Sequence, residues 1–78
     1  MILKSKITKE ILNISYTEFK KKFTKELQLA FENYRQTQLN KCSYKIKDNN
    51  SIEQDFYFNL QWNFNHFSNS IWYIEKLD

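Results

Sequence analysis

None of the 78 residues is a glycine or a proline, and this absence limits the turns that the chain can form. Tight hairpin turns of types I′ and II′ normally use glycine at positive φ, so asparagine, which also tolerates this conformation, has to replace it. We expect Asn49, Asn50 and Asn69 at such positions. Phosphate-binding loops of the GxGxxG and P-loop types are excluded, because both depend on glycine.

One segment has the pattern of a long amphipathic helix. Ser15 and Glu18 have the spacing of a capping box, in which the hydroxyl accepts from an early backbone N–H and the carboxylate reaches back to the cap residue. Apolar residues then recur every three or four positions and predict a helix over residues 16–39. The apolar stripe consists of Tyr16, Phe19, Phe23, Leu27, Ala30, Phe31 and Tyr34. The opposite face carries Glu18, Lys21, Lys25, Gln28, Glu32 and Arg35, with Leu29 as an isolated apolar residue among them.

The second part of the chain has the pattern of strands and turns. Residues 43–47 and 71–77 each predict a strand, and residues 48–51 and 66–70 predict turns. Between the turns, strict alternation predicts a third and longest strand. One face of it carries Phe56, Phe58, Leu60, Trp62 and Phe64, and the other carries Tyr57, Asn59, Gln61, Asn63 and Asn65.

The two patterns together predict a single α+β domain over residues 1–78. One long amphipathic helix packs on one face of a three-stranded antiparallel β-meander, because each apolar surface needs a cover. Trp62 and Phe23 then lie in the core. At the start of the chain, the spacing of isoleucines favours a short helix over residues 6–12, with a short strand over residues 1–5 as the alternative.

Charge is divided along the chain. Eleven of the twelve basic residues lie in residues 1–47, and five of the nine acidic residues lie in residues 48–78. This division favours binding to a charged partner over chemistry on a small molecule. Cys42 is the only cysteine, so no internal disulfide can form and a reducing cytoplasm is the expected compartment. There is no apolar run of about 18 residues, and no apolar segment follows Met1 to Lys6, so we expect neither a membrane span nor a signal peptide.

A lysine cluster is the first candidate binding site. Lys20, Lys21, Lys22 and Lys25 lie close together on the predicted helix, and with Lys4, Lys6 and Lys9 they can form a basic surface for phosphates. The alternative is a solvated helix face, in which Lys22 pairs with Glu18 and Glu26. The single arginine argues against sequence-specific readout of bases, because bidentate base contacts favour arginine.

The amide-rich face of the predicted long strand is the second candidate. Tyr57, Asn59 and Gln61 can dock a protein through hydrogen bonds or stack nucleic-acid bases, or they form an ordinary solvent face. Because asparagine repels strand association less well than lysine, pairing of two copies through a sheet edge is also expected.

The sequence offers little for catalysis. One histidine, His66, and one cysteine do not make a tetrahedral metal site. Glu53 and Asp55 lie two positions apart without a partner set, a pattern more typical of a strand that resists aggregation. We therefore expect no enzyme activity and no cofactor, although the small RNase toxins, with tyrosine, lysine and Arg35, offer an analogy at the level of the fold.

Two resemblances bear on function. Residues Ile7 to Phe19, ITKEILNISYTEF, resemble the entry of a helix-turn-helix, with Ser15 capping the recognition helix. This resemblance implies a winged-helix protein whose later hairpin forms the wing. In size and in its Lys/Asn/Ile-rich composition the chain is similar to anti-defence proteins of the anti-CRISPR kind, encoded by phages and mobile elements.

The sequence thus predicts a non-catalytic binding protein, with two possible functions. The first is an inhibitor that occludes a host protein or ribonucleoprotein enzyme that processes nucleic acid. The second is a small basic regulator that binds DNA or RNA directly through its lysine-rich helix. The expected partner-binding residues are Lys20, Lys21, Lys22, Lys25, Gln28, Leu29, Arg35, Tyr57, Asn59 and Gln61.

Overall fold

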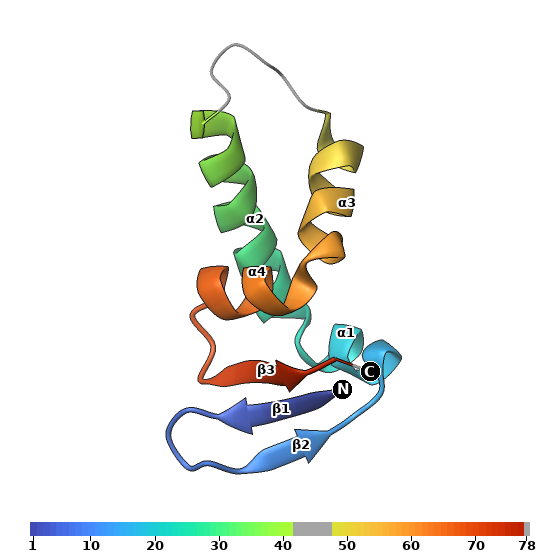
Figure 1. Cartoon of the computed structure of the whole chain (residues 1–78), viewed down its shortest axis with the longest axis vertical. Coiled ribbons are helices and arrows are strands. Elements are labelled where there is room, and N and C mark those ends of the chain that lie inside the picture. The colour runs from blue at the N-terminus through green and yellow to red at the C-terminus, as the bar shows by residue number, and fades with distance from the viewer. Residues whose placement is uncertain (42–47, 78) are drawn as a thin grey trace.

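The computed structural model describes residues 1–41 and 48–77, and it confirms the α+β class with a long helix and a three-stranded antiparallel sheet. The predicted strand over residues 43–47 lies outside the described residues. Figure 1 shows an elongated molecule, 43 × 23 × 18 Å, with the sheet at one end and the helices above it. The elements are β1 (Ile2–Ser5), β2 (Ile11–Asn13), α1 (Tyr16–Lys22), α2 (Thr24–Lys41), α3 (Asn49–Phe58), α4 (Leu60–Phe67) and β3 (Trp72–Lys76).

The sheet has the strand order β2-β1-β3, so it is not the predicted meander of the second half of the chain. The predicted strand at residues 71–77 is confirmed as β3, which pairs with β1, the strand predicted as the alternative at residues 1–5. The predicted helix over residues 6–12 is wrong, because these residues form the turn and second strand of a β1–β2 hairpin.

The hairpin turn forms without glycine because the side chain of Ser5 bonds the turn amides. Its buried hydroxyl accepts from the N–H groups of Ile7 and Thr8, at 3.2 and 3.1 Å. Lys9 takes the left-handed conformation, with φ of 65°, and it alone does so in the described part of the chain. The prediction that asparagines fill these positions is therefore wrong, and Asn49 and Asn50 lie inside α3.

The predicted long helix is present but is broken at Phe23. The Ser15 hydroxyl caps α1 as expected, accepting from the Glu18 N–H at 3.1 Å. At the break, the Thr24 hydroxyl donates to the carbonyls of Lys20 and Lys21, at 2.7 and 2.9 Å, in place of a regular helical turn. The apolar stripe continues across the break, so α1 and α2 still present one buried face.

The predicted long strand is wrong, because these residues form α3 and α4. Asp48 caps α3 by accepting from the Ser51 N–H at 2.8 Å. Phe56, Leu60 and Phe64 are buried, which is the spacing of one helix face. Phe58 and Trp62, predicted on the same apolar face, are instead 93% and 60% exposed. A run of apolar residues at every second position contains a set at every fourth position, and this set forms the core here.

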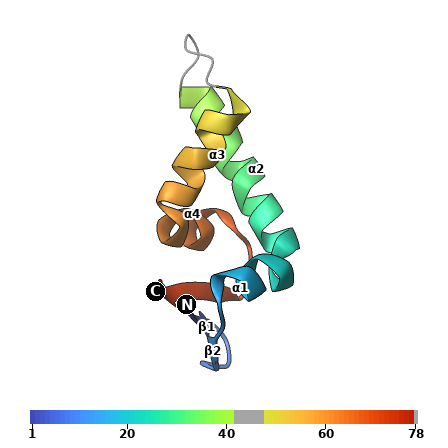
Figure 2. The ribbon, with the colours of Figure 1, turned by 90° about the vertical axis from the view of Figure 1, so that its right-hand side faces the viewer.

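Aromatic contacts join the helices into one core. Phe19 of α1 packs against Phe64 of α4, with ring centroids 5.1 Å apart. Higher up, Phe56 of α3 packs against Phe31 and Tyr34 of α2, each at 5.6 Å. Figure 2 shows the result from the side, with α2 and α3 rising together above α4 and the sheet below. This arrangement leaves α1, α2 and α3 to form the walls of a groove.

Candidate functional site

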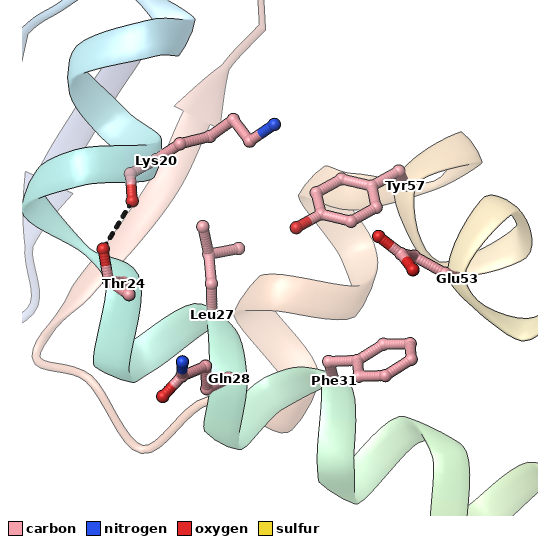
Figure 3. Close-up of a pocket in the computed structure, with 7 residues that line it drawn as sticks. All are labelled: Lys20, Thr24, Leu27, Gln28, Phe31, Glu53 and Tyr57. Carbon is pink, nitrogen blue, oxygen red and sulfur yellow. Dashed lines mark hydrogen bonds between the residues drawn. The ribbon is translucent and has the colours of Figure 1, made fainter. Parts of the chain in front are cut away.

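A groove between the α1–α2 junction and α3 brings together three of the predicted binding residues (Figure 3). We call it the Tyr57 groove. It has a volume of about 290 Å³. Its lining consists of Lys20, Thr24, Leu27, Gln28, Phe31, Glu53 and Tyr57. Lys20, Gln28 and Tyr57 were expected from the sequence, and the fold places them around one hollow although they come from three helices.

Lys20 is held at one end of the groove by two aromatic rings. Its Nζ lies 5.3 Å from the ring centroid of Tyr16 and 5.8 Å from that of Tyr57. An ammonium over an aromatic face is attracted by the ring quadrupole, by about 0.5–1 kcal/mol at an exposed site. Figure 3 shows Glu53 on the other side of Tyr57. The groove therefore has a positive and a negative rim.

Tyr57 lies where three hollows meet. A second hollow is lined by Tyr57 with Asn50, Glu53 and Gln54. A third is lined by Tyr57 with Tyr16 of α1, Leu60 of α4, and Met1 and Leu77, which flank β1 and β3. Burial raises the pKa of the Tyr57 phenol above its ordinary value, and the nearby Tyr16 and Glu53 raise this pKa further. The phenol therefore stays protonated at neutral pH and can donate a hydrogen bond to a ligand.

The floor of the groove is apolar and is fixed by the core. Leu27 is buried, and Phe31 packs edge-on against Phe56 with an interplanar angle of 82°. The Thr24 hydroxyl on the wall already donates to the Lys20 carbonyl, so it can only accept a further hydrogen bond. Gln28 is exposed and keeps both amide functions for a ligand. The apolar floor of the groove is thus fixed by core packing, whereas the exposed Gln28 side chain can adjust to a ligand.

The remaining lysines lie outside the Tyr57 groove. Lys21 and Lys22 are exposed at the end of α1, and neither makes an ion pair with a carboxylate of the described residues, so the expected pairs of Lys22 with Glu18 and Glu26 do not form. Lys25 and Leu29 line a separate hollow of about 240 Å³. The hairpin turn that carries Lys6 and Lys9 lies at the end of the sheet away from α1 (Figure 1), so the predicted basic surface is divided.

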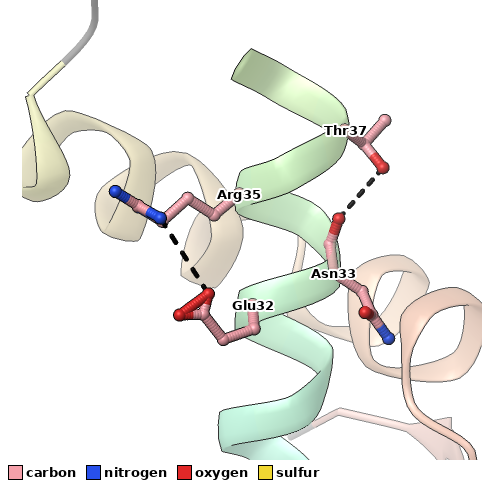
Figure 4. A network of polar contacts seen from close by, with 4 residues as sticks. All are labelled: Glu32, Asn33, Arg35 and Thr37. Atoms are coloured by element: carbon pink, nitrogen blue, oxygen red, sulfur yellow. Dashed lines mark hydrogen bonds and ion pairs between the residues drawn. The ribbon is translucent and has the colours of Figure 1, made fainter. Parts of the chain in front are cut away.

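Three further predicted binding residues lie outside the Tyr57 groove. Arg35 lies about two helical turns beyond Gln28 on α2, and its guanidinium is 4.0 Å from the Glu32 carboxylate (Figure 4). Asn59 forms the corner between α3 and α4. Gln61 donates from its amide to the carbonyls of Ile74 and Glu75, at 3.2 and 3.0 Å. These contacts hold α4 against β3.

Phe58 and Trp62 are exposed aromatic residues that were predicted on the buried face of a strand. Trp62 stacks on His66 with ring centroids 5.1 Å apart and an interplanar angle of 9°, and His66 lies in α4 and not in a turn. The helical spacing of Phe56, Leu60 and Phe64 was the available signal, because it places Phe58 and Trp62 off the core face. The floor residues of the groove were predicted only as core.

The described residues contain no set of three histidine, cysteine or acidic side chains that can hold a metal ion. Glu53 and Asp55, predicted on one strand face, lie two positions apart on a helix and so point in different directions, and only Glu53 lines the groove. Within residues 1–41 and 48–77, no helix combines the length and apolar character needed to span a membrane. The chain matches no protein-family profile, no curated protein and no solved structure.

Proposed function

We propose that this protein is a non-catalytic, cytoplasmic binding protein that inhibits a nucleic-acid-processing enzyme by covering part of its surface, as inhibitors encoded by phages and mobile elements do. The observation that carries this proposal is the Tyr57 groove. Its floor is apolar, its two rims have opposite charges, and two more hollows adjoin it at Tyr57. Open and connected hollows of this kind suit side chains from a protein partner better than an enclosed small substrate.

The chemistry of the groove indicates what the partner presents. An apolar side chain fits the floor of Leu27 and Phe31, an acidic side chain can pair with Lys20, and a basic one can pair with Glu53. The Tyr57 phenol can donate a hydrogen bond at the centre. Its pKa is raised, away from neutrality, which suits binding better than general base catalysis at neutral pH.

Adjacent lysines provide a matched test. The partner is first captured from cells with the wild-type protein and is then titrated with purified variants by calorimetry. Lys20→Ala and Lys21→Ala remove the same charge from neighbouring positions, but only Lys20 lines the groove. We expect Lys20→Ala and Tyr57→Ala to weaken binding at least tenfold and Lys21→Ala less than twofold. Equal effects of the two lysine variants contradict a role for the groove.

Direct binding to nucleic acid is the second candidate. It is supported by Lys21, Lys22 and Lys25, which are exposed near the α1–α2 junction and form no ion pair within the described part of the chain. Fluorescence anisotropy with short DNA and RNA, at low and near-physiological salt, tests it. This function requires affinity that falls steeply with salt and is lost in the double variant Lys21→Glu and Lys25→Glu. Salt-independent or absent binding at low salt excludes it and leaves a protein partner.

A further inference from the structure

The two edge strands of the sheet differ in whether their outward backbone groups are hydrogen-bonded, and those of β3 are occupied by side chains. The Ile74 N–H donates to Oδ1 of Asn65 at 2.7 Å, and Nδ2 of Asn65 donates to the Ile74 carbonyl at 2.9 Å. The side chain of Asn65 therefore forms the pair of hydrogen bonds that a neighbouring strand would form. The next outward N–H, that of Trp72, donates to the Ser70 hydroxyl at 3.0 Å. No further strand can pair there without displacing these side chains.

The β2 edge is open. The Ser5 N–H donates to the Glu10 carbonyl at 2.9 Å, and the Ile14 N–H donates to the Met1 carbonyl at 3.0 Å. Because inward and outward backbone groups alternate in an antiparallel ladder, the backbone groups of Ile11 and Asn13 point away from β1. No described element lies beyond β2 in either view of the molecule (Figures 1 and 2).

Apart from its short length, the β2 edge lacks the features that usually prevent strand pairing. Natural edges are protected by lysine, proline or a bulge, whereas β2 is the uncharged sequence Ile11-Leu12-Asn13 and pairs with β1 in regular register. The isoleucines beside this edge are exposed, Ile11 by 63% and Ile7, in the hairpin turn, by 72%. The short length of β2 limits the pairing available but leaves it unobstructed.

We infer that β2 pairs with β2 of a second copy of this chain. The outward residues, Ile11 and Asn13, lie at equal distances from Leu12, so a two-fold axis through Leu12 places Ile11 of each copy opposite Asn13 of the other. Each such pair exchanges two backbone hydrogen bonds. The half-buried Leu12 side chains then meet as a closely spaced pair on the face of the sheet that packs against the core. The pairing joins two sheets into one of six strands, and no charged residue of β2 opposes it.

Sedimentation equilibrium over about 10 to 500 μM tests the inference, together with amide hydrogen exchange. Asn13→Pro removes only an outward N–H, since the inward hydrogen bonds belong to Glu10, Leu12 and Ile14. We expect the wild type to dimerise and Asn13→Pro and Ile11→Lys each to weaken dimerisation at least tenfold. Exchange at the amides of Ile11 and Asn13 should slow as concentration rises, while the Leu12 amide is protected at every concentration.

Three results would overturn the inference. The first is a wild-type protein that stays monomeric over this concentration range. This holds also if a different protein, when added, protects the β2 amides from exchange. The second is dimerisation that Ile7→Ser abolishes and Ile11→Lys does not, since this indicates contact of apolar side chains without strand pairing. The third is dimerisation without added protection at Ile11 and Asn13. If Asn13→Pro does not fold, Ile11→Lys and the exchange measurement still decide.

Discussion

The α3–α4 segment contains two pairs of aromatic residues of similar size with opposite environments. Phe56 and Phe64 are fully buried between the helices, whereas Phe58 is 93% exposed and Trp62 is 60% exposed. All four residues lie within nine consecutive positions, so composition does not distinguish them. The comparison shows that one aromatic-rich segment supplies both the core of the domain and an exposed apolar surface. Exposed aromatic residues of this kind are more typical of a binding surface than of a folding core.

The largest expected effect is on the buried side of this comparison. Phe64→Ala removes a ring that packs edge-on against both Phe19 and Phe23, at 5.1 and 6.3 Å. Truncation of a buried phenylalanine destabilises a protein by about 3–5 kcal/mol, much of the stability available to a domain this small. Urea unfolding followed by circular dichroism measures the change. A loss below about 1 kcal/mol would mean that α4 does not pack on α1.

The next effect concerns the corner that separates the two environments. Asn63 is buried, and its Nδ2 donates to the Phe56 carbonyl at 2.9 Å, which ties α4 to the end of α3. Asn63→Ala leaves that carbonyl without this donor, and we expect a loss of about 1–3 kcal/mol in the free energy of unfolding. Asn59→Ala is the matched control, because the exposed Asn59 side chain makes no capping bond to α4. Similar losses in both variants would exclude a specific role for the buried amide.

A small effect is expected on the exposed side. Trp62→Ala and Phe58→Ala should each change the free energy of unfolding by less than about 1 kcal/mol, because these rings bury little apolar area. This expectation reverses the one from the sequence, which placed Trp62 in the core. The same urea titration measures the change in the free energy of unfolding. A loss of about 3 kcal/mol for Trp62→Ala would show that Trp62 is buried in the core. Binding to the captured partner then shows whether either ring contributes to recognition.

The smallest effect is a dependence of stability on alkaline pH. Because the pKa of the Tyr57 phenol is raised in the folded protein, its contribution to stability is full below the unfolded value of roughly 10 and is lost as pH rises through the folded value. We expect the wild type to lose more stability than Tyr57→Phe as pH rises above roughly 10. Unfolding curves for both proteins at each pH measure the difference, and identical pH profiles would contradict the burial of the phenol.

The sequence predicted those parts of the fold that depend on local pattern. The spacing from Tyr16 to Tyr34 gave the helical face of α1 and α2, and Ser15 gave its start. The α3–α4 segment could not be assigned in this way, because alternation and helical spacing share Phe56, Leu60 and Phe64. β2 has only three residues, too few for a period to be recognised.

The candidate site was only partly predictable for a different reason. Lys20 and Gln28 were expected on one helix, and Tyr57 was expected on a strand face. Their convergence depends on how α3 packs against α1 and α2, which no local pattern specifies. Gln61 was expected on a strand face as a partner-binding residue, whereas in α4 its amide donates internally, to the carbonyls of Ile74 and Glu75. Whether a polar side chain serves a partner or the fold itself is decided by tertiary packing.

The position of β1 in the middle of the sheet has a consequence for how the chain folds. Ile2 pairs with Lys76, so the central strand obtains its second neighbour from the opposite end of the described sequence. Loop closure over this separation is entropically unfavourable until the intervening helices have shortened the distance. We therefore expect the β1–β2 hairpin and the helices to form early, and β3 to add last. Such non-local pairing makes the chain a slower folder than a helical bundle of equal length.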